Sequence, residues 1–271
     1  MTNSKRTTLG VIGLALGLVA LMLIAILSAL HAVGTDGKLY YRLQQEAWLT
    51  MDAASAAGIS DDDLRMLDSR LAAYLAGDKA ALNEGDGVVE IPVRGAVQPA
   101  FNEKEMTHMA DCFRLFALLR KVRSRLIPWA VLLIVGGAYL LQNQRKARLA
   151  AWLSPLVLLI PLGAFGIWAA IDFGGAFTFF HRVLFSNDLW LLNPATDLLI
   201  RICPESMFMG MGLRIGLWGL AALVAVPALA TLITFIWPKN KQDEANKWND
   251  NRATRRASAQ RPKTFDFGEK H

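Results

Sequence analysis

Four long apolar stretches constrain this chain more than any other feature of its sequence. They cover residues Leu9–Leu30, Leu126–Leu141, Leu149–Ile171 and Ile215–Trp237. A helix needs about 20 apolar residues to cross the hydrocarbon core of a bilayer, and three of the stretches meet that length. The second is shorter, and it spans if its helix begins in the basic segment 121–125, whose side chains then extend outward. We therefore predict an all-α membrane protein with four transmembrane helices.

The composition excludes two classes of protein. Hydrophobic residues make up 54% of the 271 residues and charged residues only 19%, and the formal net charge is +6. Chains that are disordered or that coat nucleic acid are poor in apolar residues and rich in charge. We predict no nucleic-acid partner. The first apolar stretch is also longer than that of a cleavable signal peptide, so we expect a retained anchor.

The distribution of positive charge predicts how the chain crosses the membrane. Basic residues lie before the first span, between the second and third spans, and in the tail after residue 237, which holds nine Lys and Arg. The long segment 34–125 instead carries 12 basic against 14 acidic residues. Because cytoplasmic loops are enriched in Lys and Arg, we expect both termini in the cytoplasm and both long loops outside.

One basic cluster runs against this trend at the outer end of the second span, formed by Arg120, Lys121, Arg123 and Arg125. Such a cluster contacts phospholipid phosphates or anchors a short span at the interface, and the sequence leaves both open.

These features divide the chain into nine segments. In order they are a cytoplasmic N-terminus (1–8), the first span (9–33), an extracytoplasmic loop or cap domain (34–125), the second span (126–141), a cytoplasmic loop (142–148), the third span (149–171), an extracytoplasmic aromatic loop (172–211), the fourth span (212–237) and a basic cytoplasmic tail (238–271). We predict that the two extracytoplasmic loops form an outer, mostly helical cap.

Local signals predict elements within the cap. Ser60 with three following aspartates predicts a helix N-terminus, and Gly77 predicts its C-terminal cap. Residues 85–93 favour a strand of a hairpin. Asn102 with Glu105 three residues later is a capping box that predicts a helix beginning at Glu103. Asn193-Pro194 predicts a short helix that Pro204 ends, and a disulfide between Cys112 and Cys203 is left open.

Two histidines are the candidate chemical groups. His108 lies one helical turn from both Glu105 and Asp111, and His181 lies in the aromatic loop near the membrane boundary. Of the two acids, Asp111 is the better candidate to hold the His108 tautomer, because the capping box already uses Glu105. The same residues with Asp188 would have to converge to hold a metal, and we predict no metal site and no cofactor. The sequence contains no nucleophile elbow, phosphate-binding loop or zinc-protease motif.

Several motifs together resemble a known family. They are Gly58–Ser60 through Tyr74–Gly77, Phe101–Asp111, Phe180–Phe185, Asn187–Trp190, Pro194, Thr196–Ile200 and Pro204–Glu205. This pattern resembles a bacterial family of four-span membrane proteins that includes the lipoprotein intramolecular transacylases. The likeness runs from the first span to the fourth and leaves out the basic tail. Cys112 departs from the family pattern, in which a small aliphatic residue follows the aspartate.

The resemblance implies an enzyme of the bacterial cytoplasmic membrane whose active site lies on the outer face. Its substrates would be diacylglyceryl-modified lipoproteins, and membrane phospholipids would surround it. It would move the sn-2 acyl chain to the α-amine of the N-terminal cysteine and leave a lyso-form lipoprotein. The resemblance also implies that His108 and His181 are essential.

We hypothesise that His108, oriented by Asp111, is the base, and that His181 protonates the leaving oxygen or binds the oxyanion; the roles of the histidines are interchangeable at this point. The residues expected to bind substrate or assist are Arg182, Asn187, Asp188 and Trp190. Two alternatives remain: a metal-dependent lipid or peptide hydrolase, and a non-catalytic membrane subunit that binds lipids or a partner.

Overall fold

The computed structural model describes residues 3–47, 53–84, 87–141, 143–236, 248 and 251–252. The predicted basic tail at 238–271 lies outside the described residues, apart from residues 248, 251 and 252. Residues 85 and 86 of the predicted strand also lie outside them.

Both caps predicted for the helix after Ser60 are confirmed. The Ser60 hydroxyl oxygen accepts a hydrogen bond from Asp63 N at the start of the helix, and Gly77, at φ +131°, ends it.

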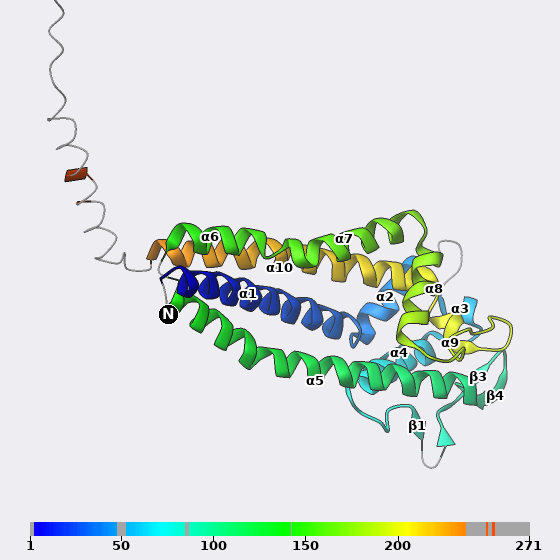
Figure 1. Cartoon of the computed structure of the whole chain (residues 1–271). Helices are drawn as coiled ribbons and strands as arrows, with labels where there is room; N and C mark the ends of the chain where they lie inside the picture. Colours follow the sequence, from blue (N-terminus) through cyan, green and yellow to red (C-terminus); the bar gives the residue numbers. More distant parts are fainter. Residues whose placement is uncertain are drawn as a thin grey trace, which may run out of the picture.

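Within the described residues, four helical rods are long and apolar enough to cross a membrane. They are α1 (Asn3–Val33), α5 (Glu103–Leu140), α6 (Gln144–Leu153) continued by α7 (Leu156–Ile171), and α10 (Glu205–Ile236). Figure 1 shows these rods side by side, with the N-terminus at one end of the bundle. The chain is therefore a helical membrane protein with four candidate spans, as predicted.

The sides of the bundle are apolar on their exposed surface. Helix α7 has no buried residue, and large side chains such as Trp129, Ile160, Ile167 and Trp218 are more than half exposed. In water such a surface would be unfavourable, but lipid chains are as apolar as these side chains. The exposed apolar surface is what a bilayer environment requires.

The smaller elements gather at the end of the bundle away from the N-terminus (Figure 1). They are α2 (Gly37–Ala47), α3 (Ala53–Ala57), α4 (Asp61–Ala76), the antiparallel pairs β1 (Asn83–Glu84) with β2 (Gly87–Val88) and β3 (Glu90–Val93) with β4 (Ala96–Pro99), α8 (Phe173–Leu184) and α9 (Leu198–Ile202). We call this group the end cap. Leucines of α4 pack with Phe101, Ile91 and Ile202 in its core.

Helix α5 joins the end cap to the bundle without interruption. It begins at Glu103 with the predicted capping box of Asn102 and Glu105, and it continues through the basic cluster and Pro128 to Leu140. Its 38 residues are about 57 Å long, whereas the hydrocarbon core is about 30 Å thick. The first half of α5 therefore projects beyond the membrane-spanning part, which begins near residue 120.

Other boundaries differ from the sequence expectations. The short loop between the second and third spans is largely helical, because α6 begins at Gln144, and Ser154-Pro155 separates α6 from α7. Helix α10, which contains the predicted fourth span, begins at Glu205, before the start of that span near residue 212. The aromatic loop contains a twelve-residue helix, α8, that follows directly after α7.

The predicted helix start at Asn193-Pro194 is wrong. Residues 194–196 form a turn, and the short helix α9 begins only at Leu198. Asp197 causes this, because its carboxylate accepts a hydrogen bond from Asn193 N at 2.7 Å and closes the turn back on itself. The helix does end before Pro204, as expected. Cys112 and Cys203 are both free thiols.

Small residues set the contact between α1 and α5. A Cβ at Gly10 or Gly17 would lie 2.8 Å or less from the backbone or side chains of Leu141 and Ile134 on α5. A Cβ at Gly137 would clash with the backbone of Leu14. Glycine at these positions lets the two backbones approach closely, which is how helices associate in lipid.

The adjacent glycines of α5 provide a matched test of this contact. Gly137→Ala should destabilise the protein by about 1–3 kcal/mol, because the added methyl group meets backbone that cannot move aside. Gly136→Ala should be neutral or slightly stabilising, because nothing lies within 4 Å of its Cβ and alanine favours helix. Thermal unfolding of both variants in detergent measures the difference, and equal midpoints would contradict the close packing of α1 on α5.

Candidate functional site

The two candidate histidines meet at the junction of the end cap and the bundle. His108 lies on the projecting part of α5 and His181 lies in the last turn of α8, and their ring centres are 6.4 Å apart. Helix α8 crosses from the end of α7 toward α5 (Figure 1). Its start is fixed by Asp172, whose carboxylate accepts a hydrogen bond from Gly175 N.

Glu105 holds the aromatic loop against α5, one turn before His108. One carboxylate oxygen accepts from Asn102 N at 2.8 Å, which closes the capping box, and the other accepts from Leu199 N at 2.6 Å. Asn102 in turn donates its side-chain amide to Asp197 at 2.9 Å. The start of α9 is thereby bonded to the start of α5. The sequence signal identified Glu105 only as a cap of its own helix, and nothing in the spacing pointed to Leu199.

His108 is buried, with 8% of its surface exposed. Its Nε2 lies 3.6 Å from Cys112 Sγ, and its Nδ1 is buried without a hydrogen-bond partner among the described residues. Burial lowers the pKa of His108 to about 4, and neighbouring His181 adds to the effect, whereas Asp111 opposes it. The imidazole is therefore neutral at pH 7.

His181 is held by its own helix and by aromatic rings. Its Nδ1 lies 2.8 Å from the carbonyl oxygen of Phe177. A carbonyl oxygen can only accept, so Nδ1 carries the hydrogen and Nε2 keeps its lone pair. The rings of Phe177, Phe185 and Trp190 lie 4.1 to 5.6 Å from the imidazole. Burial lowers the pKa of His181, and the bond to Phe177 partly offsets this.

Asp111 does not hydrogen-bond His108, contrary to the expected orienting role. Its carboxylate accepts from Arg114 Nη1 at 2.7 Å and from Asn187 Nδ2 at 2.9 Å. The hydrogen bond from Asn187, which is 76 residues away, competes for an oxygen that the helix spacing would have offered to His108. Asp111 thus bonds the loop after α8 to α5 and acts on His108 through charge alone.

A small cavity lies beside this connection. It has a volume of about 160 Å³, and its lining residues are Asp111, Arg114, Leu115, Leu184, Phe185, Ser186 and Asn187. Phe185 also lies edge-on to His108, with ring centres 5.1 Å apart. The cavity therefore reaches the immediate surroundings of the histidine pair.

The structure brings most of the sequence-predicted site residues together. His108, His181, Asp111, Asn187 and Trp190 share this region through the contacts above. The side chains of Arg182 and Asp188 are exposed and make no hydrogen bond or ion pair with other described residues. Across the described part of the chain, no group of three or more His, Cys, Asp or Glu is arranged to hold a metal ion.

Comparisons with known proteins give one consistent result. The family model "Lipoprotein intramolecular transacylase Lit" matches residues 15–208. No match is found among curated protein sequences. A solved structure of the membrane integral lipoprotein intramolecular transacylase Lit from Bacillus cereus is similar in fold, with a TM-score of 0.54 and 23% identity. That match covers 84% of this chain and 93% of the other.

A variant of the Bacillus cereus protein in which a histidine is replaced by arginine matches in the same way. Its TM-score is 0.55 at 24% identity, with 80% of this chain and 88% of the other covered.

The titration of His108 tests the geometry of the pair. Imidazole NMR signals, assigned by their loss in His108→Ala, should show His108 neutral from pH 7 down to about pH 5, because the pKa is about 4. In His181→Ala the pKa of His108 should rise partway, because burial, the larger cause, remains. In Asp111→Asn the pKa of His108 should fall further, because the negative charge that raises it is removed. Titration of native His108 near pH 6.5 would contradict the buried environment.

Proposed function

The chain belongs to the lipoprotein intramolecular transacylase family Lit, and we propose that it moves the sn-2 acyl chain of a diacylglyceryl lipoprotein to the α-amine of its N-terminal cysteine. The observation that carries this proposal is the pair of neutral imidazoles, 6.4 Å apart, at the part of α5 that projects beyond its membrane-spanning part. A lipidated N-terminus would have its acyl chains in the bilayer and its amine at the headgroups. His108 lies on the part of α5 that projects beyond the membrane-spanning part, on the headgroup side of the hydrocarbon.

The proposed reaction breaks an ester and forms an amide within one molecule. The amine nitrogen attacks the ester carbonyl carbon, the carbon–oxygen bond to glycerol breaks, and one proton passes from nitrogen to the departing oxygen. Because the amine and the ester are tethered, the effective concentration of the nucleophile is already high. The protein then needs only a proton carrier and a donor for the oxyanion.

The hydrogen bonds favour His181 as the proton carrier, in place of His108, which the sequence suggests as the base. His181 Nε2 has a free lone pair because Nδ1 is bonded to Phe177 O. It would take the amine proton and return it to the glycerol oxygen. No other base needs to take part in this transfer.

His108 is suited to donate a hydrogen bond to the oxyanion. Burial raises the pKa of Cys112 to about 12, so the residue stays a thiol and can donate to His108 Nε2. The hydrogen of His108 would then be on Nδ1, which is buried and has no partner among the described residues. A neutral imidazole can stabilise a developing oxyanion as a donor, as one does in triosephosphate isomerase.

The remaining site residues would bind and orient the substrate. Trp190 and Phe185 form an apolar wall beside His181 that fits an acyl chain. Asn187, bonded to Asp111, would position the loop that follows α8. Arg182 and Asp188 are exposed near this loop and are available to the polar part of the lipoprotein.

We further propose that the end cap faces outward and that both termini are cytoplasmic in a bacterial cytoplasmic membrane. The basic residues of α6 and the N-terminus lie together at the opposite end of the bundle (Figure 1). Cytoplasmic segments carry this excess of Lys and Arg. The exposed side chains of Lys121 and Arg125 would then meet phospholipid phosphates on the outer face.

Single-residue labelling tests this orientation. A cysteine at Asp62, which is exposed in α4, should react with a membrane-impermeant maleimide added to intact cells. A cysteine at the exposed Lys146 should react only after the membrane is opened. The parent protein measures the background from the two half-buried native cysteines. The reverse labelling pattern would overturn the proposed orientation.

Replacing either histidine tests the reaction. His108→Ala and His181→Ala should each lower the rate by roughly 10²–10⁴-fold, because each removes one of two groups that act on the same transition state. The double variant should be little worse than either single variant. Mass spectrometry of a diacylglyceryl lipopeptide should detect one acyl chain on nitrogen and one on glycerol. His31→Ala, on α1 outside the site, should keep the native rate.

Three results would contradict the proposal. Full activity of both single variants would exclude catalysis by these histidines and favour a lipid-binding or partner-binding subunit. Release of a free fatty acid with an unblocked amine would indicate a hydrolase. Loss of activity when a chelator is added would indicate a metal-dependent hydrolase.

A further inference from the structure

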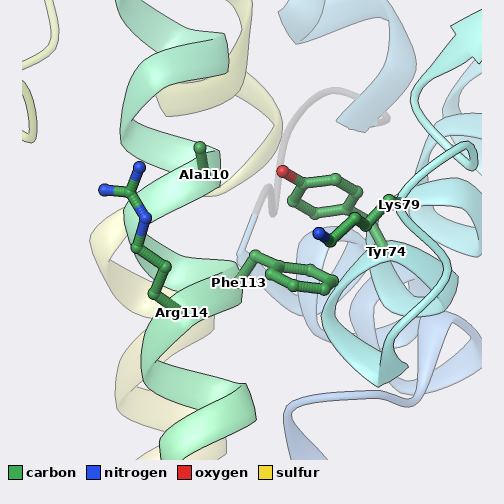
Figure 2. A pocket seen from close by; sticks show the side chains of 5 residues that line it. All are labelled: Tyr74, Lys79, Ala110, Phe113 and Arg114. Carbon is green, nitrogen blue, oxygen red and sulfur yellow. The ribbon is translucent and has the colours of Figure 1, made fainter.

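A second cavity lies on the opposite side of α5 from His108. It has a volume of about 360 Å³, and its lining residues are Tyr74, Lys79, Ala110, Phe113 and Arg114. Figure 2 shows Phe113 extending from α5 toward Tyr74 and Lys79. Phe113 and Arg114 follow His108 by five and six residues, so the helical repeat turns them away from it. The cavity is therefore separate from the histidine pair.

The surroundings of this cavity are positively charged. Lys79 Nζ lies 5.6 Å from the centre of the Phe113 ring, and the guanidinium carbon of Arg120 lies 6.0 Å from it. Arg120 is fixed there because it donates to Leu75 O at 2.7 Å. Among the described residues neither cation forms an ion pair. Two unpaired cations beside one ring favour an anionic ligand.

Two acids close in the chain to these cations or to Phe113, Asp78 and Asp111, do not pair with the cations. Asp78 Oδ1 accepts from Ala80 N within its own turn. Asp111 is paired with Arg114, whose side chain is 77% exposed and points away from Tyr74 in Figure 2. Arg114 also lines the small cavity beside the histidines. A single side chain thus connects the two cavities.

The register of α1 against α5 gives the depth of this cavity. Gly10 faces Leu141, Gly17 faces Ile134 and Gly34 faces Phe116. Extended to the end of the first apolar stretch, this register sets Leu30 beside residue 120 of α5. Phe113 lies seven residues farther out, which is about 10 Å along a helix. The headgroup region extends about 5–8 Å beyond the hydrocarbon, so the cavity opens at the outer edge of that region.

We propose that this cavity binds the phosphodiester of an anionic phospholipid. Lys79, which lines the cavity, contacts the phosphate, and Arg120 adds positive charge from beside the Phe113 ring. The buried Tyr74 contributes its hydroxyl, which Figure 2 shows near Phe113 and Lys79. The acyl chains follow the exposed apolar side of α5 below the cavity, where Ile127 and Val131 lie on the same face as Phe113, about four and five turns nearer the opposite end of the helix. A diacylglyceryl thioether contains no phosphate, so this lipid is distinct from the lipoprotein and the proposal is independent of the transacylase reaction.

A binding assay with matched charge variants tests the site. The full chain in a neutral detergent is titrated with dioleoyl phosphatidylglycerol, and the rise in its unfolding midpoint gives an apparent affinity. Lys79→Gln should weaken that affinity about tenfold, because it removes a charge-assisted bond to the phosphate. Lys79→Arg should restore it. Lys38→Gln, which removes an exposed lysine on α2 that does not line the cavity, should bind like the native protein.

Each alternative ligand has its own arm in this assay. Dioleoyl phosphatidylcholine should produce a smaller rise, because its headgroup carries no net charge, and inorganic phosphate should produce none at the same concentration. An equal response to inorganic phosphate would replace the lipid with a free anion. Native affinity in Lys79→Gln, or equal weakening in Lys38→Gln, would overturn the site itself.

Discussion

The position of the histidine pair depends on one buried carboxylate. Glu105 is 1% exposed and accepts hydrogen bonds from the backbone of two segments that are 97 positions apart, at Asn102 and Leu199. Burial raises the pKa of Glu105, and the bonds from these N–H groups work against that rise. A buried carboxylate without such partners would be strongly unfavourable. The aromatic loop therefore docks where these N–H groups can be satisfied, and α8 with His181 follows from that docking.

The bilayer determines the frame on which this docking occurs. Lipid does not drive helices together by the hydrophobic effect, so close backbone contact and hydrogen bonds must do so. Helices α1 and α5 achieve this through glycines at Gly10, Gly17 and Gly137. Because α5 is longer than the membrane is thick, the same rigid helix carries His108 beyond the hydrocarbon. The distance of His108 from the bilayer is thus set by packing deep within it.

Sequence reasoning succeeded where the cause is local. The caps at Ser60, Gly77 and Asn102, and the four candidate spans, depend on neighbours in the chain or on the solvent, and all could be predicted. It failed where the partner is distant. Asp111 bonds Asn187 instead of His108, and Asp197 uses its carboxylate to close a turn and to bind Asn102. Helical spacing identifies which side chains are near each other on one helix. It carries no information on residues of another element that compete for the same hydrogen-bonding atoms.

The two imidazoles are both neutral yet differ in the hydrogen that each can offer. His181 donates its Nδ1 hydrogen to a backbone carbonyl, so the lone pair of Nε2 remains available to the site. His108 faces the thiol of Cys112 with one nitrogen, and its other nitrogen is buried without a partner among the described residues. In such a buried environment a hydrogen bond to a developing charge is stronger than in water. A proton acceptor and a neutral donor are what an amine and an ester require when they are already joined. In the proposed reaction, the backbone carbonyl and the thiol, rather than a carboxylate, would therefore assign the two roles to the two histidines.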